Sequence, residues 1–224
     1  MKKFLLLFLT LSSFFVFSQE EKKAVVDSLF REDQMYVLLS FNLLQNKPTD
    51  FNQHALSSGI SFGFLRDMPI NKKRTWALAT GLGYSYSNLK SNIKIETSSS
   101  TISYSIDNNF EKNKLILHQL DIPLEIRWRN ATFDSHKFWR IYSGFKLSYL
   151  FAEKAEFIST TETIKVNNIN DLSKIKYGAY LSVGNNTGNI YAYYALSPLF
   201  KNVKINNEDL KLKSFYIGLV FYIL

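Results

Sequence analysis

Strict alternation of apolar and polar side chains over residues 116–128 constrains the fold of this chain more than any other feature. A β-strand points successive side chains to opposite faces, so this period of two predicts a strand. One face carries Ile116, His118, Leu120, Ile122, Leu124, Ile126 and Trp128, and the other carries Leu117, Gln119, Asp121, Pro123, Glu125 and Arg127. The segment is long enough for a strand tilted across a bilayer. Because the second face is crowded with charge, we expect the apolar face to contact lipid and the polar face to line a closed lumen.

The first residues of the chain resemble an export signal. Lys2 and Lys3 precede the almost wholly apolar run 4–17, and Ser18 ends it before the charged residues 20–23. This pattern predicts a signal peptide over residues 1–18. The alternative is a membrane anchor helix, but the apolar run is shorter than the roughly 20 residues that a spanning helix needs. We therefore expect a short periplasmic lead-in over 19–33 and one domain over 34–224.

Composition bounds the remaining function classes. The 224 residues suit one domain. Cysteine is absent, which excludes disulfides and thiolate chemistry. The formal net charge is +8, yet the lysines and arginines lie mostly in predicted loops and at strand ends. No basic helix or aromatic RNA-binding motif accompanies them, so we expect no nucleic-acid partner. Attraction to anionic lipid head groups is the simpler explanation of the basic charge.

Eight segments have the alternation of strands, and their connections alternate in length. The predicted strands are Gln34–Leu44, Ser57–Asp67, Thr75–Ser87, Leu115–Arg129, Phe138–Ala152, Lys174–Asn185, Asn189–Phe200 and Lys213–Leu224. The longer connections follow the first, third, fifth and seventh strands and cover 45–56, 88–114, 153–173 and 201–212. This rhythm predicts an all-β, eight-stranded antiparallel transmembrane barrel of the outer membrane. Its short turns and both termini would be periplasmic, and its long loops extracellular.

The lumen of this barrel is predicted to be filled. On the third strand only small residues face inward, namely Ala77, Ala79, Gly81, Gly83, Ser85 and Ser87. They leave room for larger inward groups, for which we propose Tyr142, Lys146, Tyr180 and Arg140. An eight-stranded barrel is just wide enough to be filled by its own side chains. A filled lumen argues against an open diffusion pore.

Charged residues on the inward faces need partners, because isolated charges in a poorly hydrated interior are costly. The proposed lumen charge network comprises Asp67, Asp121, Glu125, Arg127, Arg129, Arg140 and Lys146. For the hairpin between the fourth and fifth strands, we predict a turn at residues 133–134, so that paired residue numbers sum to about 267. This register places Asp121 opposite Lys146 and Arg127 opposite Arg140. The network is either a scaffold that fixes register, which we favour, or a gate or substrate path.

Three tryptophans test the topology. Trp76, Trp128 and Trp139 all belong to lipid-facing sets and lie near the same end of their predicted strands. Aromatic residues favour membrane–water interfaces. We therefore predict a periplasmic aromatic girdle of these three residues, with Tyr84, Tyr86 and Tyr149 in the opposite girdle.

Residues for catalysis are sparse. The histidines are His54, His118 and His136, of which two lie in connections. A lipid hydrolase could use a lipid-facing histidine such as His118 with a nearby serine and acid. No motif assembles such a triad, and no spacing suits a metal. We expect a non-enzymatic protein without cofactors.

Three segments resemble the PorT-like outer-membrane β-barrel family of Bacteroidetes. They are GFLRDMPINKKRTWALATGLGYSYS at 63–87, HQLDIPLEIRWR at 118–129 and KFWRIYSGFKLSYLF at 137–151. The namesake of the family is required for protein export through the type IX secretion system. The resemblance implies an accessory or assembly component of that system, with outer-membrane lipid and secretion-system proteins as partners. The alternative is a general structural barrel or a small-solute porin.

Overall fold

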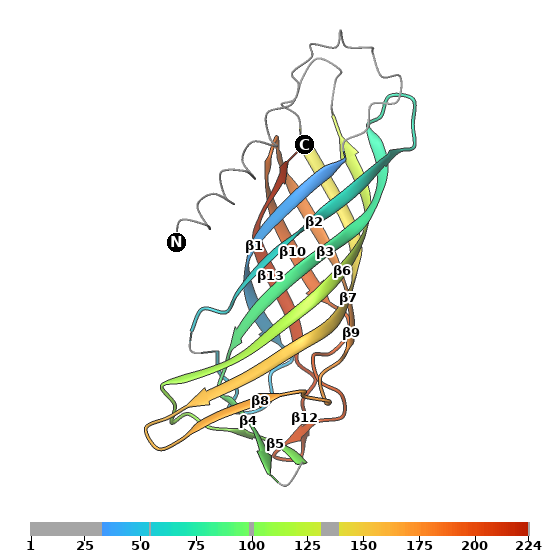
Figure 1. Ribbon diagram of the computed structural model, residues 1–224. Coiled ribbons are helices and arrows are strands. Elements are labelled where there is room, and N and C mark those ends of the chain that lie inside the picture. Colours follow the sequence, from blue (N-terminus) through green and yellow to red (C-terminus); the bar gives the residue numbers. More distant parts are fainter. Residues whose placement is uncertain (1–32, 54, 99–100, 131–138, 224) are drawn as a thin grey trace, which may run out of the picture. The chain divides into compact units, whose positions relative to one another are not determined.

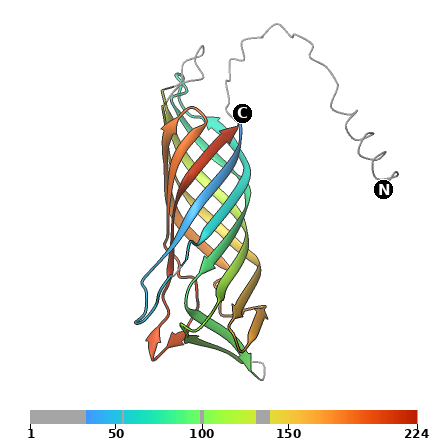
Figure 2. The same cartoon turned by 90° about the vertical axis from the view of Figure 1, so that its left-hand side faces the viewer.

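Eight long antiparallel strands close into a barrel in this computed structural model, which describes residues 33–53, 55–98, 101–130 and 139–223 (Figures 1 and 2). They are β1 (Gln34–Gln45), β2 (Ser58–Pro69), β3 (Trp76–Lys90), β6 (Lys112–Arg129), β7 (Trp139–Ile158), β9 (Ile175–Asn185), β10 (Gly188–Ala195) and β13 (Lys213–Ile223). Each strand pairs with the next, β13 pairs with β1, and the β6–β7 pairing completes the ring. The predicted fold class is confirmed. The expected signal peptide lies outside the described residues, as does the lead-in except for Asp33.

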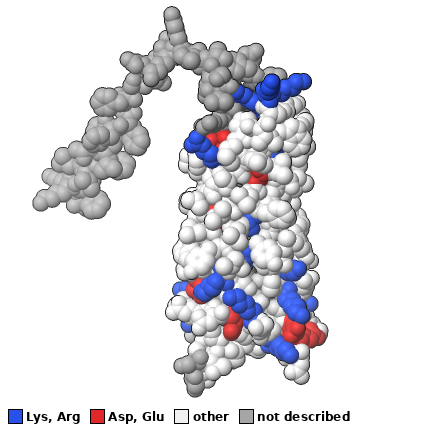
Figure 3. Space-filling model, turned by 90° about the vertical axis from the view of Figure 1, so that its right-hand side faces the viewer, with Lys and Arg blue, Asp and Glu red and all other residues white. Residues whose placement is uncertain are grey.

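The two faces of the barrel wall differ in chemistry. Burial alternates along β6, where Asp121 is wholly buried while Leu120 and Leu124 are 52% and 57% exposed. Large exposed apolar side chains occur on all eight long strands. A soluble surface rarely carries an apolar patch of that extent. Figure 3 shows the mostly white band that they form on one face, with charged residues gathered toward the two ends. Such a band is the lipid-facing surface that a transmembrane β-barrel requires.

We call the end of the barrel that holds Gln34 and Ile223 the termini end, and the opposite end the loop end. At the loop end the connections form short strands rather than simple loops, which the alternation pattern does not predict. A hairpin forms from β4 (Ile93–Ser98) and β5 (Thr101–Ile106), and β8 (Thr163–Asn167) pairs with β7. Two short strands, β11 (Lys204–Ile205) and β12 (Glu208–Asp209), pair with each other.

An apolar core closes the loop end. Buried residues of these connections cluster with inward residues at the ends of the long strands, and we call this cluster the apolar cap. It comprises Leu44, Leu89, Ile93, Ile95, Leu115, Leu117, Leu150, Ala155, Val166, Ile169, Leu172, Leu199, Phe200, Val203, Ile205, Leu210 and Leu212. The barrel therefore extends beyond the apolar band as a small globular tip. Among the described residues no helix is long and apolar enough to span a membrane.

Strand β7 is longer than the sequence predicts. The predicted strand ends at Ala152, whereas β7 continues to Ile158. A register shift separates the pair His118–Ala152 from the pair Gln119–Leu150, so Phe151 is an extra residue opposite β6. Such a β-bulge reverses the phase of the alternation. Outward residues of β7 have odd numbers before the bulge and even numbers after it, which made the strand seem to end there.

Two further predictions of detail were wrong. In the β6–β7 hairpin Arg127 pairs with Tyr142 and Arg129 with Arg140, so paired numbers sum to 269 rather than 267. A slip of two residues leaves every side chain on its own face, so alternation cannot distinguish these two registers. The seventh strand ends at Ala195 rather than Phe200. Pro198 lies in that tail, and a proline cannot donate to a strand ladder.

Candidate functional site: the filled barrel interior

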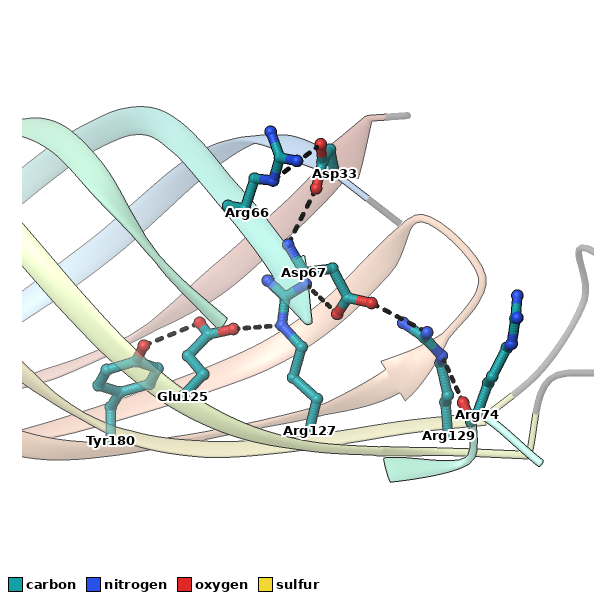
Figure 4. Close-up of polar contacts among 8 residues, drawn as sticks. All are labelled: Asp33, Arg66, Asp67, Arg74, Glu125, Arg127, Arg129 and Tyr180. Carbon is teal, nitrogen blue, oxygen red and sulfur yellow. Dashed lines mark hydrogen bonds and ion pairs between the residues drawn. The ribbon is translucent and has the colours of Figure 1, made fainter. Parts of the chain in front are cut away.

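Asp67 is the centre of an ion-pair network at the termini end of the lumen. It lies near the end of β2, and its side chain is wholly buried. Arg127 Nη1 donates to Asp67 Oδ1 at 3.0 Å, and Arg129 Nη2 donates to Asp67 Oδ2 at 3.0 Å. Both arginines lie on the inward face of β6, two residues apart, so their guanidinium groups reach one carboxylate. Figure 4 shows this arrangement.

The network continues toward the middle of the barrel through Glu125. Arg127 Nε donates to Glu125 Oε2 at 2.6 Å, and the Tyr180 hydroxyl donates to Glu125 Oε1 at 2.8 Å (Figure 4). The Arg127 guanidinium also lies 4.7 Å from the ring centre of Tyr142, a cation–π distance. Both carboxylate oxygens of Glu125 are therefore engaged, as are Nε and Nη1 of Arg127, whereas Arg127 Nη2 makes no hydrogen bond to the described residues. Hydrogen bonds of this kind offset part of the desolvation of a buried ion pair.

At the rim, the network reaches the chain's backbone. Arg129 Nε donates to the carbonyl of Arg74, 3.1 Å away in the β2–β3 turn. Asp33 accepts from the Asp67 backbone N–H at 3.0 Å and forms a looser ion pair with Arg66 at 3.7 Å. These contacts, which we call the Asp67 network, thus join β2, β6 and β9 to the β2–β3 turn and to Asp33, the residue before β1.

A second charged group lies farther from the termini. Lys146 Nζ is 3.1 Å from Asp121 Oδ2, and Ser148 Oγ donates to Asp121 Oδ1 at 2.6 Å. Lys146 Nζ also lies 4.8 Å from the ring centre of Tyr193. Lys176 is buried nearby, and its ammonium makes no hydrogen bond to the described residues. Sequence reasoning did not single out Lys176, although its inward parity on β9 was readable.

The remaining predicted site residues lie at the termini end. Arg140 Nη1 donates to the carbonyl of Asn186, which lies in the β9–β10 turn 2.7 Å away. Trp76 pairs with Trp128 across β3 and β6, and Trp139 begins β7. Trp76 and Trp139 are 44% and 55% exposed, and Trp128 is half-buried. The three tryptophans thus lie on the outer face near one rim.

Tyrosines fill much of the lumen, and sequence reasoning found only part of this layer. One buried cluster contains Tyr36, Leu38, Leu65, Tyr142, Tyr180, Tyr191, Tyr193, Ala195, Tyr216, Val220 and Tyr222. The predicted fillers Tyr142 and Tyr180 are among them. The others had a signal, because Tyr191 and Tyr193, like Tyr216 and Tyr222, share the face opposite an apolar stripe. We call the seven tyrosines the tyrosine layer.

The space left in the lumen is small. One cavity lined by Tyr36, Asp121, Glu125, Lys146, Tyr191 and Tyr222, among others, has a volume of ≈ 20 Å³. A second, lined by Lys146, Ser148, Lys176, Tyr193 and Tyr216, among others, has ≈ 10 Å³. About 10–15 Å³ of this measure accommodates one water molecule. Each space is therefore suited to single waters rather than to a solute.

Chemically reactive clusters do not appear in the part of the chain that the structure describes. No group of three or more His, Asp or Glu residues there could hold a metal ion. A hydrogen bond of 2.7 Å joins Nδ1 of the outward His118 to the Tyr84 hydroxyl, with the donor set by the histidine tautomer. His118 packs among Tyr86 and Phe151 on the outer face. Aromatic neighbours of this kind are typical of a side chain at a membrane–water interface.

The closed antiparallel ring, the apolar outer band and the filled polar interior together define a transmembrane β-barrel. The chain belongs to the family described as outer membrane protein beta-barrel domain, whose model matches residues 17–201. It is therefore an outer-membrane barrel protein. None of the curated proteins matches the chain.

Two solved structures of Ail, the attachment invasion locus protein of Yersinia pestis, are similar in fold. The first, in complex with the heparin analogue sucrose octasulfate, has 13% identity and a TM-score of 0.42. That comparison covers 86% of this chain and 99% of the Ail chain. The second has 11% identity and a TM-score of 0.39, with 85% and 97% covered. A likeness of this size bears on neither ligand nor activity.

Proposed function

We propose that this protein is a plugged, non-enzymatic outer-membrane barrel that works through its surfaces, as an accessory or assembly component of type IX protein secretion. The observation that carries the surface-based mode of action is the filled lumen. Three barriers lie in series, namely the Asp67 network, the tyrosine layer and the apolar cap. A solute would have to displace buried ion pairs and an apolar core. This favours contacts with partner proteins over passage of a substrate.

The secretion role rests on the sequence resemblance at 63–87, 118–129 and 137–151. Those segments contain much of the Asp67 network, because Asp67, Glu125, Arg127 and Arg129 lie within the first two. In this proposal the network is a scaffold that keeps β2, β3 and β6 in register. The termini end faces the periplasm and the folded loop end faces outward. Partner proteins would contact the barrel at its two ends, since lipid covers the band between them.

Deletion of the gene tests the secretion role. We expect the cell-surface proteins that leave through type IX secretion to accumulate inside the deletion strain, and the wild-type gene to restore their export. Mass spectrometry of surface and periplasmic fractions measures both. Unchanged export in a strain shown to lack the protein would contradict the role. A defect limited to uptake of small solutes would favour the porin alternative.

Orientation is tested separately. A short protease-cleavable tag inserted after Ser98, between β4 and β5, should be cut on intact cells. The same tag appended after Leu224 should be cut only after the outer membrane is opened. The reverse pattern would place the termini outside.

A further inference from the structure

A basic patch lies on the outer face of the loop end, just beyond the apolar band. One row of paired residues runs across four neighbouring strands: Lys90 on β3 pairs with Lys114 on β6, Lys114 with Glu156 on β7, and Glu156 with Lys165 on β8. Strands lie roughly 4.8 Å apart, so this row spans about 14 Å. The adjacent rows add Lys112 and Lys154 on the same face. We call these five lysines the lysine patch.

Most of the positive charge in the lysine patch is not neutralised. Glu156 is the acidic residue within these rows, and it pairs with Lys114 at 3.0 Å and Lys112 at 3.5 Å. Lys90, Lys154 and Lys165 form no ion pair with any described residue. Like charges crowded on neighbouring strands repel. A surface that keeps them together gains if an anion binds there.

The surroundings of the patch point to a lipid rather than to a free anion. The next row toward the termini end holds Tyr86 and His118, which are in contact with each other at a ring-centre distance of 5.4 Å. Tyr84 and Phe151 pack beside His118. Below these aromatic side chains the exposed apolar band begins at Leu120. A molecule bound at the lysines would therefore have an aromatic belt and then a lipid-facing surface directly beneath it.

The β7 bulge creates this continuity. Phe151 and Ala152 are both exposed, and beyond them the outward face of β7 carries Lys154 and Glu156. Without the extra residue, Glu153 would face outward in place of Lys154. Glu153 instead faces inward, where it pairs with Lys174 at 2.9 Å. The bulge therefore brings a lysine rather than a glutamate to the outer face.

We propose that the lysine patch is a binding site for the phosphate of an anionic membrane lipid, whose acyl chains lie against the apolar band below. Lys114, Lys154 and Lys165 surround the phosphate, while the aromatic belt holds the region between head group and chains. This site is independent of the secretion role, because it needs only the barrel and its membrane. It anchors the loop end at a fixed height in the bilayer.

Native mass spectrometry of the full chain in detergent micelles tests the site. The probes are dimyristoyl phosphatidylglycerol and dimyristoyl phosphatidylcholine, which share their acyl chains. We expect the wild type to retain phosphatidylglycerol in preference to phosphatidylcholine. The triple variant Lys114→Gln, Lys154→Gln and Lys165→Gln should weaken phosphatidylglycerol binding at least tenfold, since each lysine near an anionic surface contributes about fivefold.

The matched control removes the same charge elsewhere at the loop end. Lys201→Gln, Lys204→Gln and Lys211→Gln change exposed residues outside the patch and should leave the preference unchanged. If the patch variant does not fold, the single variant Lys165→Glu on β8 provides the same comparison. Equal loss in patch and control variants, or no loss in the patch variant, would overturn the proposal. Displacement of the lipid by millimolar glycerol phosphate would also overturn it, because the site would then recognise a soluble anion.

Discussion

At the scale of single residues, Asp67 illustrates how charges are tolerated inside this barrel. Its two oxygens each accept from a different arginine, and those arginines have further partners in Glu125 and the Arg74 carbonyl. Removing the carboxylate charge leaves two guanidinium groups short of a partner in a buried site. Loss of one member of a buried pair typically costs more than the pair itself contributes. The network is therefore sensitive to the loss of Asp67 in particular.

We predict that Asp67→Asn destabilises the barrel by about 3–5 kcal/mol. Urea unfolding of protein refolded into phospholipid vesicles measures the change. Asp209→Asn is the control, because the Asp209–Lys211 pair is half-exposed or more on both sides. Exposed pairs contribute only about 0–1 kcal/mol. If Asp67→Asn and Asp209→Asn lowered the free energy of unfolding equally, the Asp67 network would not stabilise the barrel.

Gly83 shows why one inward position must lack a side chain. A Cβ atom there would lie 2.1 Å from the Tyr36 hydroxyl and 3.1 Å from Tyr36 Cζ. We predict that Gly83→Ala costs about 1–3 kcal/mol through overpacking. Tyr36→Phe removes the nearest atom, so the double variant should recover part of that loss. The double-mutant cycle is read from the same urea unfolding experiment.

Gly188→Ala is the control for Gly83→Ala. A Cβ at Gly188 meets only Phe221 Cε1 at 4.0 Å, an ordinary contact. We expect a change within about 0.5 kcal/mol there. Additive effects of Gly83→Ala and Tyr36→Phe would show that the two side chains do not compete for space.

The sequence predicts well whether a side chain points into the lumen or out to lipid. It predicts less well which residues that side chain contacts. Alternation along 116–128 assigns Asp121, Glu125 and Arg127 to the interior, and the structure buries all three. The register needs more than alternation. Arg127 pairs with Tyr142 across the hairpin, while its charged contacts come from β2 and from its own strand. Contacts between strands distant in the sequence depend on barrel closure, which no local pattern encodes.

At the scale of strands, β6 has the simplest lipid-facing surface. Leu120, Ile122, Leu124 and Ile126 are all more than 40% exposed. We predict that Leu120→Arg or Ile122→Arg costs about 2–4 kcal/mol in vesicles, because a charge would enter the hydrocarbon region. Met35→Arg, at the termini end of β1, should cost only about 0–1 kcal/mol, because strand ends lie near the interface. Equal costs at both depths would mean that the apolar band is not where lipid lies.

Strand extent was the least predictable property of the elements. Alternation located all eight long strands, but the tail of β7 beyond Ala152 was hidden by the bulge. The short strands of the loop end were also missed. β4, β5 and β8 have at most six residues each, too few for periodicity to separate them from loops. Their apolar residues become meaningful only when the apolar cap brings distant connections together.

The connections at the loop end are also joined by polar contacts. Glu208 on β12 accepts from the Thr49 backbone N–H at 3.0 Å and from its hydroxyl at 2.8 Å. These donors lower the pKa of Glu208. A carboxyl with a lowered folded-state pKa contributes stability above its unfolded-state pKa, and that stability is lost as pH falls through the folded-state value. The link between the two connections should therefore weaken on acidification.

Hydrogen exchange at Thr49 measures that weakening. We predict that protection of the Thr49 amide, normalised to its intrinsic exchange rate, falls as pH drops below about 4.3, the ordinary value for a glutamate. Glu208→Gln should have low protection at every pH and no such transition. A pH dependence that persists in Glu208→Gln would assign it to another group.

At the scale of the whole molecule, three barriers of different chemistry occupy one lumen. The Asp67 network closes the termini end with charge, the tyrosine layer fills the middle, and the apolar cap covers the loop end. The strand rhythm predicted the barrel, and small inward residues on β3 predicted a filled interior. The apolar cap was not predictable, since its residues come from three connections and from the ends of four long strands. Because each barrier in a series blocks the lumen by itself, the effects on conductance of opening two of them should not be additive.

We predict that the wild-type protein gives no conductance steps in planar bilayers, because the two lumen cavities described above have room only for single waters. Tyr36→Ala, Tyr191→Ala and Tyr222→Ala together widen the ≈ 20 Å³ cavity that these residues line but leave the apolar cap in place. Replacing residues 92–108 by a short Gly-Ser turn removes β4 and β5 from the cap but leaves the tyrosine layer. Each change alone should therefore conduct little, whereas the combined variant, in which only the Asp67 network still closes the lumen, should conduct more than the sum of the two. Conductance by the wild type would favour the porin alternative, and full conductance from the turn replacement alone would show that the tyrosine layer is not a barrier.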